Sequence, residues 1–279
     1  MKVLEQGGVA LAGLITSILT AIIITAFHSY TGFNLFQFSL WFVVPVGAAL
    51  CGFAAASGYY LAARYLHTKP SRYLLAQMIV IAAITQLSIY YLEYYYLVID
   101  GLRVKDVIGF SGYLDLILTK AHMKVGRAAH IDAGEVGSFG YWLAVFDFIG
   151  FLAGAIFVYV SLKSLPSCEK CSKYFGKVGI KKDSFSDFDE FASYFDGVYA
   201  NPVDSAEFAT HVGAEYSAGN AQQGTVNLET RILQCPSCED QLVCEKAQVF
   251  NGKEWKEVSE LSRAIAMPSG INVRPAFGV

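Results

Sequence analysis

The sequence predicts an α-helical membrane protein, a four-helix transmembrane bundle, followed by a small cytoplasmic domain of mixed α and β structure. Of the 279 residues, 54% are hydrophobic and only 16% are charged, whereas an ordinary soluble domain carries about 25% charged residues. Four apolar segments are long enough to cross a bilayer, which takes about 20 residues of helix. A more polar stretch with two Cys-x-x-Cys pairs follows the last apolar segment.

The predicted transmembrane domain covers residues 1–162, and its four spans are expected at residues 9–27, 40–65, 74–99 and 141–162. A cleaved signal peptide is the alternative for the first segment. Its apolar run is long and no small-x-small cleavage site follows it, which favours a membrane anchor.

The distribution of Lys and Arg predicts the topology. The segment 28–39 contains neither residue, whereas the segment after the second span is basic and six lysines fall between Lys163 and Lys182. Basic residues that flank spans stay on the cytoplasmic side, so both termini are expected in the cytoplasm, in a prokaryotic inner membrane. The long outer loop, residues 100–140, opposes this assignment through its own basic residues Arg103, Lys105, Lys120, Lys124 and Arg127.

A helix is expected inside this outer loop, from Tyr113 to Val125. Its apolar side would consist of Leu114, Ile117, Leu118 and Val125. Such a helix can lie in the headgroup plane or cap the bundle.

Three ionisable residues fall within or at the end of predicted spans: His28, Glu93 and Asp147. Ionisable side chains at membrane depth are costly and usually pair or face water, so these three could form a proton or cation site. The alternative is an interfacial position helped by the hydroxyl groups of the tyrosines around Glu93. His122 and His130 in the outer loop could add metal ligands.

Small residues at four-residue spacing predict close helix packing. Gly150 and Gly154 lie in the fourth span, and Ala48, Gly52 and Ala56 lie in the second. This spacing lets helix backbones approach closely, either within one bundle or between subunits of a homo-oligomer.

The two cysteine pairs, Cys168 with Cys171 and Cys235 with Cys238, have the spacing of a structural zinc site. One Zn²⁺ per chain is the expected cofactor. A redox dithiol is the alternative, but no thioredoxin-like pattern surrounds either pair. Cys244 falls in a predicted strand and is expected to pack there.

The order of strand, cysteine pair, strand and hairpin around these residues resembles a zinc ribbon, over residues 165–262. Zinc ribbons commonly separate their two pairs by about 15–20 residues, whereas 63 residues intervene here. The resemblance implies a zinc-ribbon-like cytoplasmic domain over residues 163–279. It leaves open whether the two pairs share one ion.

An acidic helical insertion, expected at residues 183–224, accounts for the long separation. Phe188, Phe191, Phe195 and Tyr199 recur at helical spacing and predict an aromatic stripe. This stripe would pack on the ribbon or dock in the groove of a partner.

Further elements are expected around the second cysteine pair. The sequence Asp-Ser-Ala-Glu from Asp204 resembles a capping box and predicts a second helix. Alternation over residues 226–232 predicts a strand, and Asn251-Gly252 predicts a two-residue hairpin between residues 241–250 and 253–258. The tail from Pro268 is expected to be extended.

The chain carries no basic stripe, so no nucleic-acid partner is expected. It also lacks a P-loop, a dinucleotide fingerprint, an HExxH motif and a GxSxG motif, which leaves no motif-based argument for an enzyme. The favoured hypothesis is a membrane-anchored zinc-binding scaffold or sensor that presents a protein-interaction domain to a cytoplasmic partner. The alternatives are a small transporter or channel that uses Glu93 and Asp147 under control of the zinc domain, and a membrane metalloenzyme.

Overall fold

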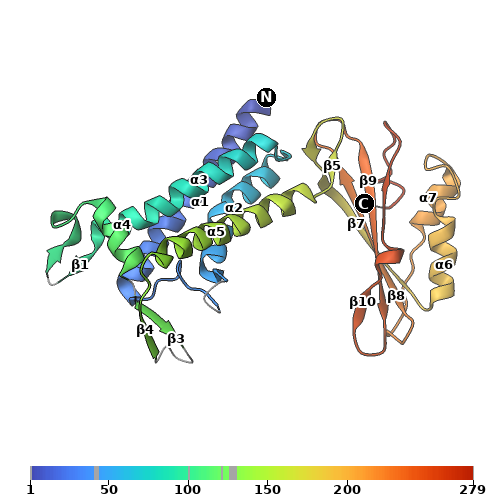
Figure 1. The fold of residues 1–279 in the computed structure, drawn as a ribbon. Helices are drawn as coiled ribbons and strands as arrows, with labels where there is room; N and C mark the ends of the chain where they lie inside the picture. Colours follow the sequence, from blue (N-terminus) through green and yellow to red (C-terminus); the bar gives the residue numbers. More distant parts are fainter. Residues whose placement is uncertain (1, 41–43, 100, 121, 126–130, 279) are drawn as a thin grey trace. The chain divides into compact units, whose positions relative to one another are not determined.

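The computed structural model describes residues 2–40, 44–99, 101–120, 122–125 and 131–278. The chain forms two compact units, Met1–Leu165 and Pro166–Val279. The first unit is helical, and the second is built on a five-stranded sheet (Figure 1).

The first unit contains four helices that are long and apolar enough to cross a membrane, which confirms this coarser part of the predicted fold class. These helices are α1 (Lys2–Thr31), α2 (Val46–Tyr65), α3 (Arg72–Tyr96) and α5 (Phe139–Lys163). Helix α2 begins six residues later than the predicted residue 40. Pro45 occupies its N-cap, and the residue before a proline is disfavoured in helical conformation, so Val44 instead forms a β-bridge with Leu40.

Helix α2 lies against α1 and α5 through small residues. A Cβ atom at Gly52 would lie 1.9 Å from the carbonyl oxygen of Phe151 in α5, and one at Gly154 would lie 2.1 Å from the carbonyl oxygen of Ala49. On the other side of α2, the Thr16 hydroxyl of α1 donates a hydrogen bond of 2.6 Å to the carbonyl oxygen of Ala55. The backbones of α2 and α5 therefore approach at a distance that only glycine permits at these two positions.

The segment between α3 and α5 contains a shorter helix than the sequence predicts, and it contains strands that the sequence does not predict. Its helix, α4, spans Phe110–Thr119 and not 113–125, because the backbone of the following residues pairs in a hairpin. The other elements here are β1 (Val98–Ile99), β2 (Leu102–Arg103), the 3-10 turn η1 (Val104–Asp106), β3 (His122–Val125) and β4 (Ile131–Glu135). Leu114 and Ile117 of α4 pack against the buried core of the four long helices.

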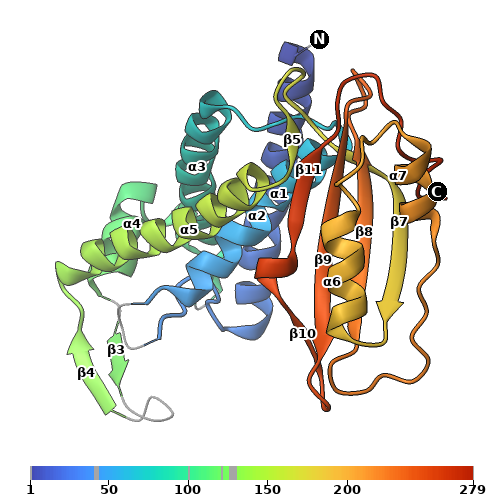
Figure 2. The same cartoon turned by 90° about the vertical axis from the view of Figure 1, so that its right-hand side faces the viewer.

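The second unit is a twisted antiparallel sheet with one face covered by helices. Strands β7 (Gly176–Phe185), β8 (Val226–Gln234) and β9 (Gln241–Phe250) pair in sequence order. The outer edge of β9 pairs with β11 (Arg263–Ala266) along its first half and with β10 (Trp255–Glu257) near its end, and the 3-10 turn η3 (Ser259–Leu261) separates these two short strands. Helices α6 (Phe188–Gly197) and α7 (Ala206–Gly213) connect β7 to β8 and lie on the same side of the sheet (Figures 1 and 2).

The core of the second unit lies between the sheet and these two helices. In α6, Phe191 and Tyr194 are buried, whereas Phe188 is half exposed. Three members of the predicted aromatic stripe, Phe191, Phe195 and Tyr199, thus lie in or against the core. Phe188, the first helical residue after the N-cap Asp187, is not part of it. Phe191 and Phe195 pack in or against the core of their own domain.

Three further expectations need correction. The predicted insertion begins too early at residue 183, because β7 continues to Phe185 through its pairing with β8. Helix α7 is capped by Ser205 and not by the preceding residue, since the Ser205 hydroxyl accepts from Phe208 N at 3.1 Å. The hairpin between β9 and β10 has a four-residue loop and not a two-residue one, because the Asn251 side chain accepts hydrogen bonds from the amides of Lys253 and Glu254.

A polar row crosses the helix-covered face of the sheet. Lys181, Thr230, Glu245 and Arg263 lie directly opposite one another on β7, β8, β9 and β11. Glu245 is only 1% exposed. It accepts hydrogen bonds from the Arg263 guanidinium and, at 3.3 Å, from the Tyr199 hydroxyl. Burial raises the pKa of Glu245, although Arg263 opposes the shift.

The C-terminal tail closes the same core. Val273 and Phe277 are buried in it, and the Gln241 side chain accepts a hydrogen bond from Val273 N and donates one to Asn272, both at 2.9 Å. The tail is thus anchored to the start of β9. It is not extended throughout, as the sequence predicts, because the chain turns at residues 269–270 and again over residues 274–278.

Candidate metal centre

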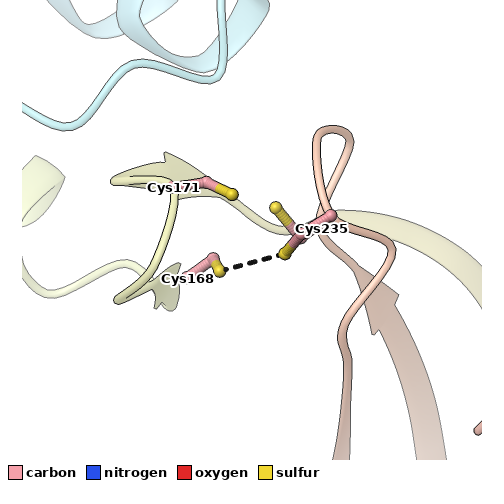
Figure 3. A group of neighbouring side chains, drawn as sticks. Cys168, Cys171 and Cys235 are labelled. Carbon is pink, nitrogen blue, oxygen red and sulfur yellow. Dashed lines mark hydrogen bonds between the residues drawn. The ribbon is translucent and has the colours of Figure 1, made fainter. Parts of the chain in front are cut away.

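The four cysteines of the two Cys-x-x-Cys pairs come together at one end of the sheet. Their Sγ atoms all lie within 4.8 Å of one another. Cys168 and Cys235 are buried, and Cys171 and Cys238 are half buried. Figure 3 shows Cys168 and Cys171 pointing from one hairpin toward Cys235. Among the residues that the structure describes, no other group of three or more His, Cys, Asp or Glu side chains is placed to hold a metal ion.

A short hairpin positions the first pair. Strands β5 (Ser167–Cys168) and β6 (Lys173–Tyr174) pair so that Cys168 lies opposite Lys173. The chain turns between them, and the amide of Ser172 donates a hydrogen bond of 2.9 Å to the carbonyl oxygen of Cys168. Ser172 has a φ of +53°, in the left-handed region.

The second pair has the same backbone arrangement in the loop between β8 and β9. The amide of Glu239 donates a hydrogen bond of 3.0 Å to the carbonyl oxygen of Cys235, and Glu239 has a φ of +61°. Non-glycine residues rarely adopt this conformation. The sequence gives no sign of it, because a glycine would be the usual residue after the second cysteine of such a turn.

The donor set fits one tetrahedral ion shared by both pairs. Zn–S bonds of about 2.3 Å in a tetrahedron require sulfur atoms about 3.8 Å apart. The sulfur atoms of Cys168 and Cys238, one from each pair, lie 3.5 Å apart. Four thiolates are a ligand set typical of structural zinc sites, so the four cysteines could form a zinc-ribbon-like module.

Backbone amides are directed at the thiols of the second pair. Burial disfavours a thiolate at Cys235, but hydrogen bonds from the amides of Ser237 and Cys238 outweigh it and lower the pKa of Cys235. The amide of Asp240 similarly favours a thiolate at Cys238, yet burial and the neighbouring thiols raise the pKa of Cys238. The neighbouring thiols thus favour a thiolate at Cys235 and oppose one at Cys238, and a divalent cation would stabilise thiolates at both.

Lys170 links the two pairs from outside. Its ammonium group lies 2.7 Å from the Asp240 carboxylate and donates a hydrogen bond of 2.6 Å to the Ser269 hydroxyl in the tail. The thiols of Cys168 and Cys238 are close enough to interact electrostatically with the Lys170 charge. A Zn²⁺ ion with four thiolates carries a net charge of −2, which this lysine would partly offset.

The remaining two cysteines lie elsewhere. Cys244 is in β9, and Cys51 is buried in α2. Neither belongs to the four-cysteine group, and all six cysteines are free thiols.

The structure also places the three ionisable residues of the long helices at the same end of the first unit. The His28 Nδ1 atom at the end of α1 lies 2.7 Å from the Glu93 Oε1 atom in the last turn of α3. Asp147 is buried in α5. Of the two histidines between α3 and α5, His122 is the first residue of β3, while His130 lies outside the described residues.

Comparisons with protein-family models, with curated proteins and with solved structures find no significant match to this chain.

Proposed function

We propose that this protein is a membrane-anchored zinc-binding scaffold or sensor, whose cytoplasmic zinc-ribbon-like domain binds another protein. The observation that carries the proposal is the cluster of four thiols within 4.8 Å in a domain that directly follows a long apolar helix.

The anchor consists of the four long helices. Their length and hydropathy suit a bilayer of about 30 Å of hydrocarbon. Only residues 164–166 connect α5 to β5. The lysines that follow α5 support a cytoplasmic position for the zinc domain.

We assign a structural role to zinc. A closed site of four cysteines leaves no coordination position for a substrate. When bound, the ion would fix the two cysteine turns to each other and so hold the end of the sheet together. The domain then presents a surface and does not catalyse.

The uncovered face of the sheet is the surface that we assign to the partner. It contains a hollow of about 390 Å³. Its rim carries charges of both signs, including Lys182, Glu229, Arg231, Lys246 and Glu257. Lys182 pairs with Glu229 and Lys246 with Glu257 across the strands, and Arg231 pairs with Glu229 along β8. A surface of mixed charge suits a polar protein partner. Complementary charges would set the orientation and specificity of binding more than its affinity.

Site-specific photocrosslinking in native membranes tests this assignment. A benzoylphenylalanine at Gln248, which lies in the hollow, should give one discrete adduct. The same probe at Glu207, an exposed residue of α7, should give none. Introducing Cys168→Ser should abolish the Gln248 adduct. Equal adducts at Gln248 and Glu207, or a Gln248 adduct that survives Cys168→Ser, would contradict the proposal. An adduct of twice the chain mass would show that the partner is a second copy of this chain.

A small transporter or channel is the second candidate. Its support is the burial of both Glu93 and Asp147 at one end of the helical unit. Flux measured in proteoliposomes should then fall with Glu93→Gln and with Asp147→Asn. Flux that neither substitution changes would remove this candidate.

A further inference from the structure

We propose that Asp147, together with Glu93, Tyr90 and His28, forms a proton-binding site within the helical unit. The inference goes beyond the scaffold role and does not depend on the zinc domain. It rests on contacts inside the first unit only.

The starting observation is a buried carboxyl group without a partner. Asp147 is 6% exposed, and among the described residues no hydrogen bond or ion pair satisfies its carboxyl group. An isolated carboxylate in a low-dielectric interior is very unfavourable, and such a group becomes neutral instead. The simplest way to neutralise it is to bind a proton.

The second carboxyl group is buried but is partnered. Glu93 is 8% exposed. Its Oε1 atom contacts the His28 ring at 2.7 Å and accepts a weaker hydrogen bond of 3.5 Å from the Asn34 amide. His28 is 34% exposed, so this pair connects a buried acid to the surface of the unit.

Tyr90 is near enough to both carboxyl groups to interact with their charges. Its hydroxyl interacts with the charges of both Asp147 and Glu93. It accepts a hydrogen bond of 3.3 Å from Gln86, whose amide also donates to the carbonyl oxygen of Ala144 in α5 at 3.2 Å. These bonds fix α3 and α5 relative to each other around the site.

The other titratable groups near the site supply no compensating charge. From α4, the Tyr113 hydroxyl lies near Glu93 and Tyr90. Asp115 of α4 is hydrogen-bonded to Tyr141 of α5 at 2.7 Å, in an exposed position. The titratable side chains among the buried residues of α2 are Cys51 and Tyr59, and neither supplies a positive charge. Within the described part of the chain, therefore, no lysine or arginine forms an ion pair with Asp147.

Labelling with dicyclohexylcarbodiimide tests the proposal, because this apolar reagent modifies protonated carboxyl groups. Full-length protein in mild detergent is labelled in potassium buffer between pH 5.5 and 8.5, and the adducts are located by peptide mass spectrometry. We expect an adduct on Asp147 whose yield falls at least tenfold across this range. Asp147→Asn should remove the adduct, and Glu93→Gln should keep it.

Two controls make the result decisive. Exposed Asp115 should remain unlabelled under the same conditions. The native helical unit should gain more stability than Asp147→Asn as the pH falls, because only the native unit buries this acid. Absence of an Asp147 adduct at every pH would overturn the proposal. Protection of Asp147 by 100 mM sodium at constant pH would also overturn it, in favour of a metal-cation site.

Discussion

The close contact between α2 and α5 makes Gly52→Ala the sharpest test of the helical unit. A Cβ atom at this position would lie 1.9 Å from the Phe151 carbonyl oxygen, and real Cβ contacts are not shorter than about 3.0 Å. The two helices would therefore have to separate locally by at least about 1.1 Å. Overpacking of this kind costs about 1–3 kcal/mol.

The matched control is Gly7→Ala in α1, where a Cβ atom meets nothing within 4 Å. Alanine is favoured over glycine in a helix by up to about 1 kcal/mol, so Gly7→Ala should be neutral or stabilising. Gly52→Ala gains the same helix propensity but loses the contact. The two variants should thus differ by about 2 kcal/mol in the stability of the helical unit.

Cys51 provides the assay. It is buried next to Gly52 in α2, and its alkylation on heating in detergent reports opening of the helical unit. Gly52→Ala should become reactive at a lower temperature than Gly7→Ala. Gly154→Ala should destabilise the Gly52→Ala variant by less than it destabilises the native protein, because the two helices have already separated in that variant. Indistinguishable midpoints for Gly52→Ala and Gly7→Ala would refute the close packing.

Three further predictions concern the second unit. Arg263→Met leaves Glu245 buried without its ion-pair partner and should destabilise the domain by about 3–5 kcal/mol at neutral pH. Because burial raises the pKa of Glu245, the contribution of Glu245 to stability should be greatest below its unfolded-state pKa and fall as the pH rises through its folded-state pKa, more steeply in this variant. A loss of stability that does not depend on pH, measured by pulse proteolysis, would argue against this role of Glu245. Lys170→Met should speed zinc loss to a chelator by up to about tenfold, whereas Lys177→Met on exposed β7 should not, and equal rates would rule out a role for Lys170. Cys238→Ser should remove the protease resistance of the sheet domain while the helical unit remains folded, since metal binding supplies much of the folding energy of such domains; an unchanged digestion pattern would contradict this.

The long helices and the cysteine cluster could be anticipated from sequence because each depends on a local signal. Hydropathy alone predicts four long apolar helices, and the Cys-x-x-Cys spacing alone predicts two metal-binding turns. The predicted start of α2 was wrong because the residues before Pro45 are apolar and extend the hydrophobic segment. Pro45 itself marks the true start of the helix. The length of α4 was overestimated for a similar reason, since the apolar residues of β3 fit the helical pattern equally well.

Long-range pairings could not be read from the sequence. The contact between His28 and Glu93 joins residues 65 positions apart. The polar row through Thr230 and Glu245 depends on the register of four strands, and β11 is too short to show a clear alternation. The left-handed conformation of Glu239 has no residue signal, because a charged side chain replaces the glycine that would reveal it.

The central claim is that the two cysteine pairs share one structural zinc ion, and metal stoichiometry tests it most directly. Intact protein purified in mild detergent without added metal would be analysed by mass spectrometry for metal content, alongside the Cys168→Ser variant. We expect one zinc per chain in the native protein and none in the variant. No zinc in the native protein, or an equal amount of zinc in both, would contradict the claim.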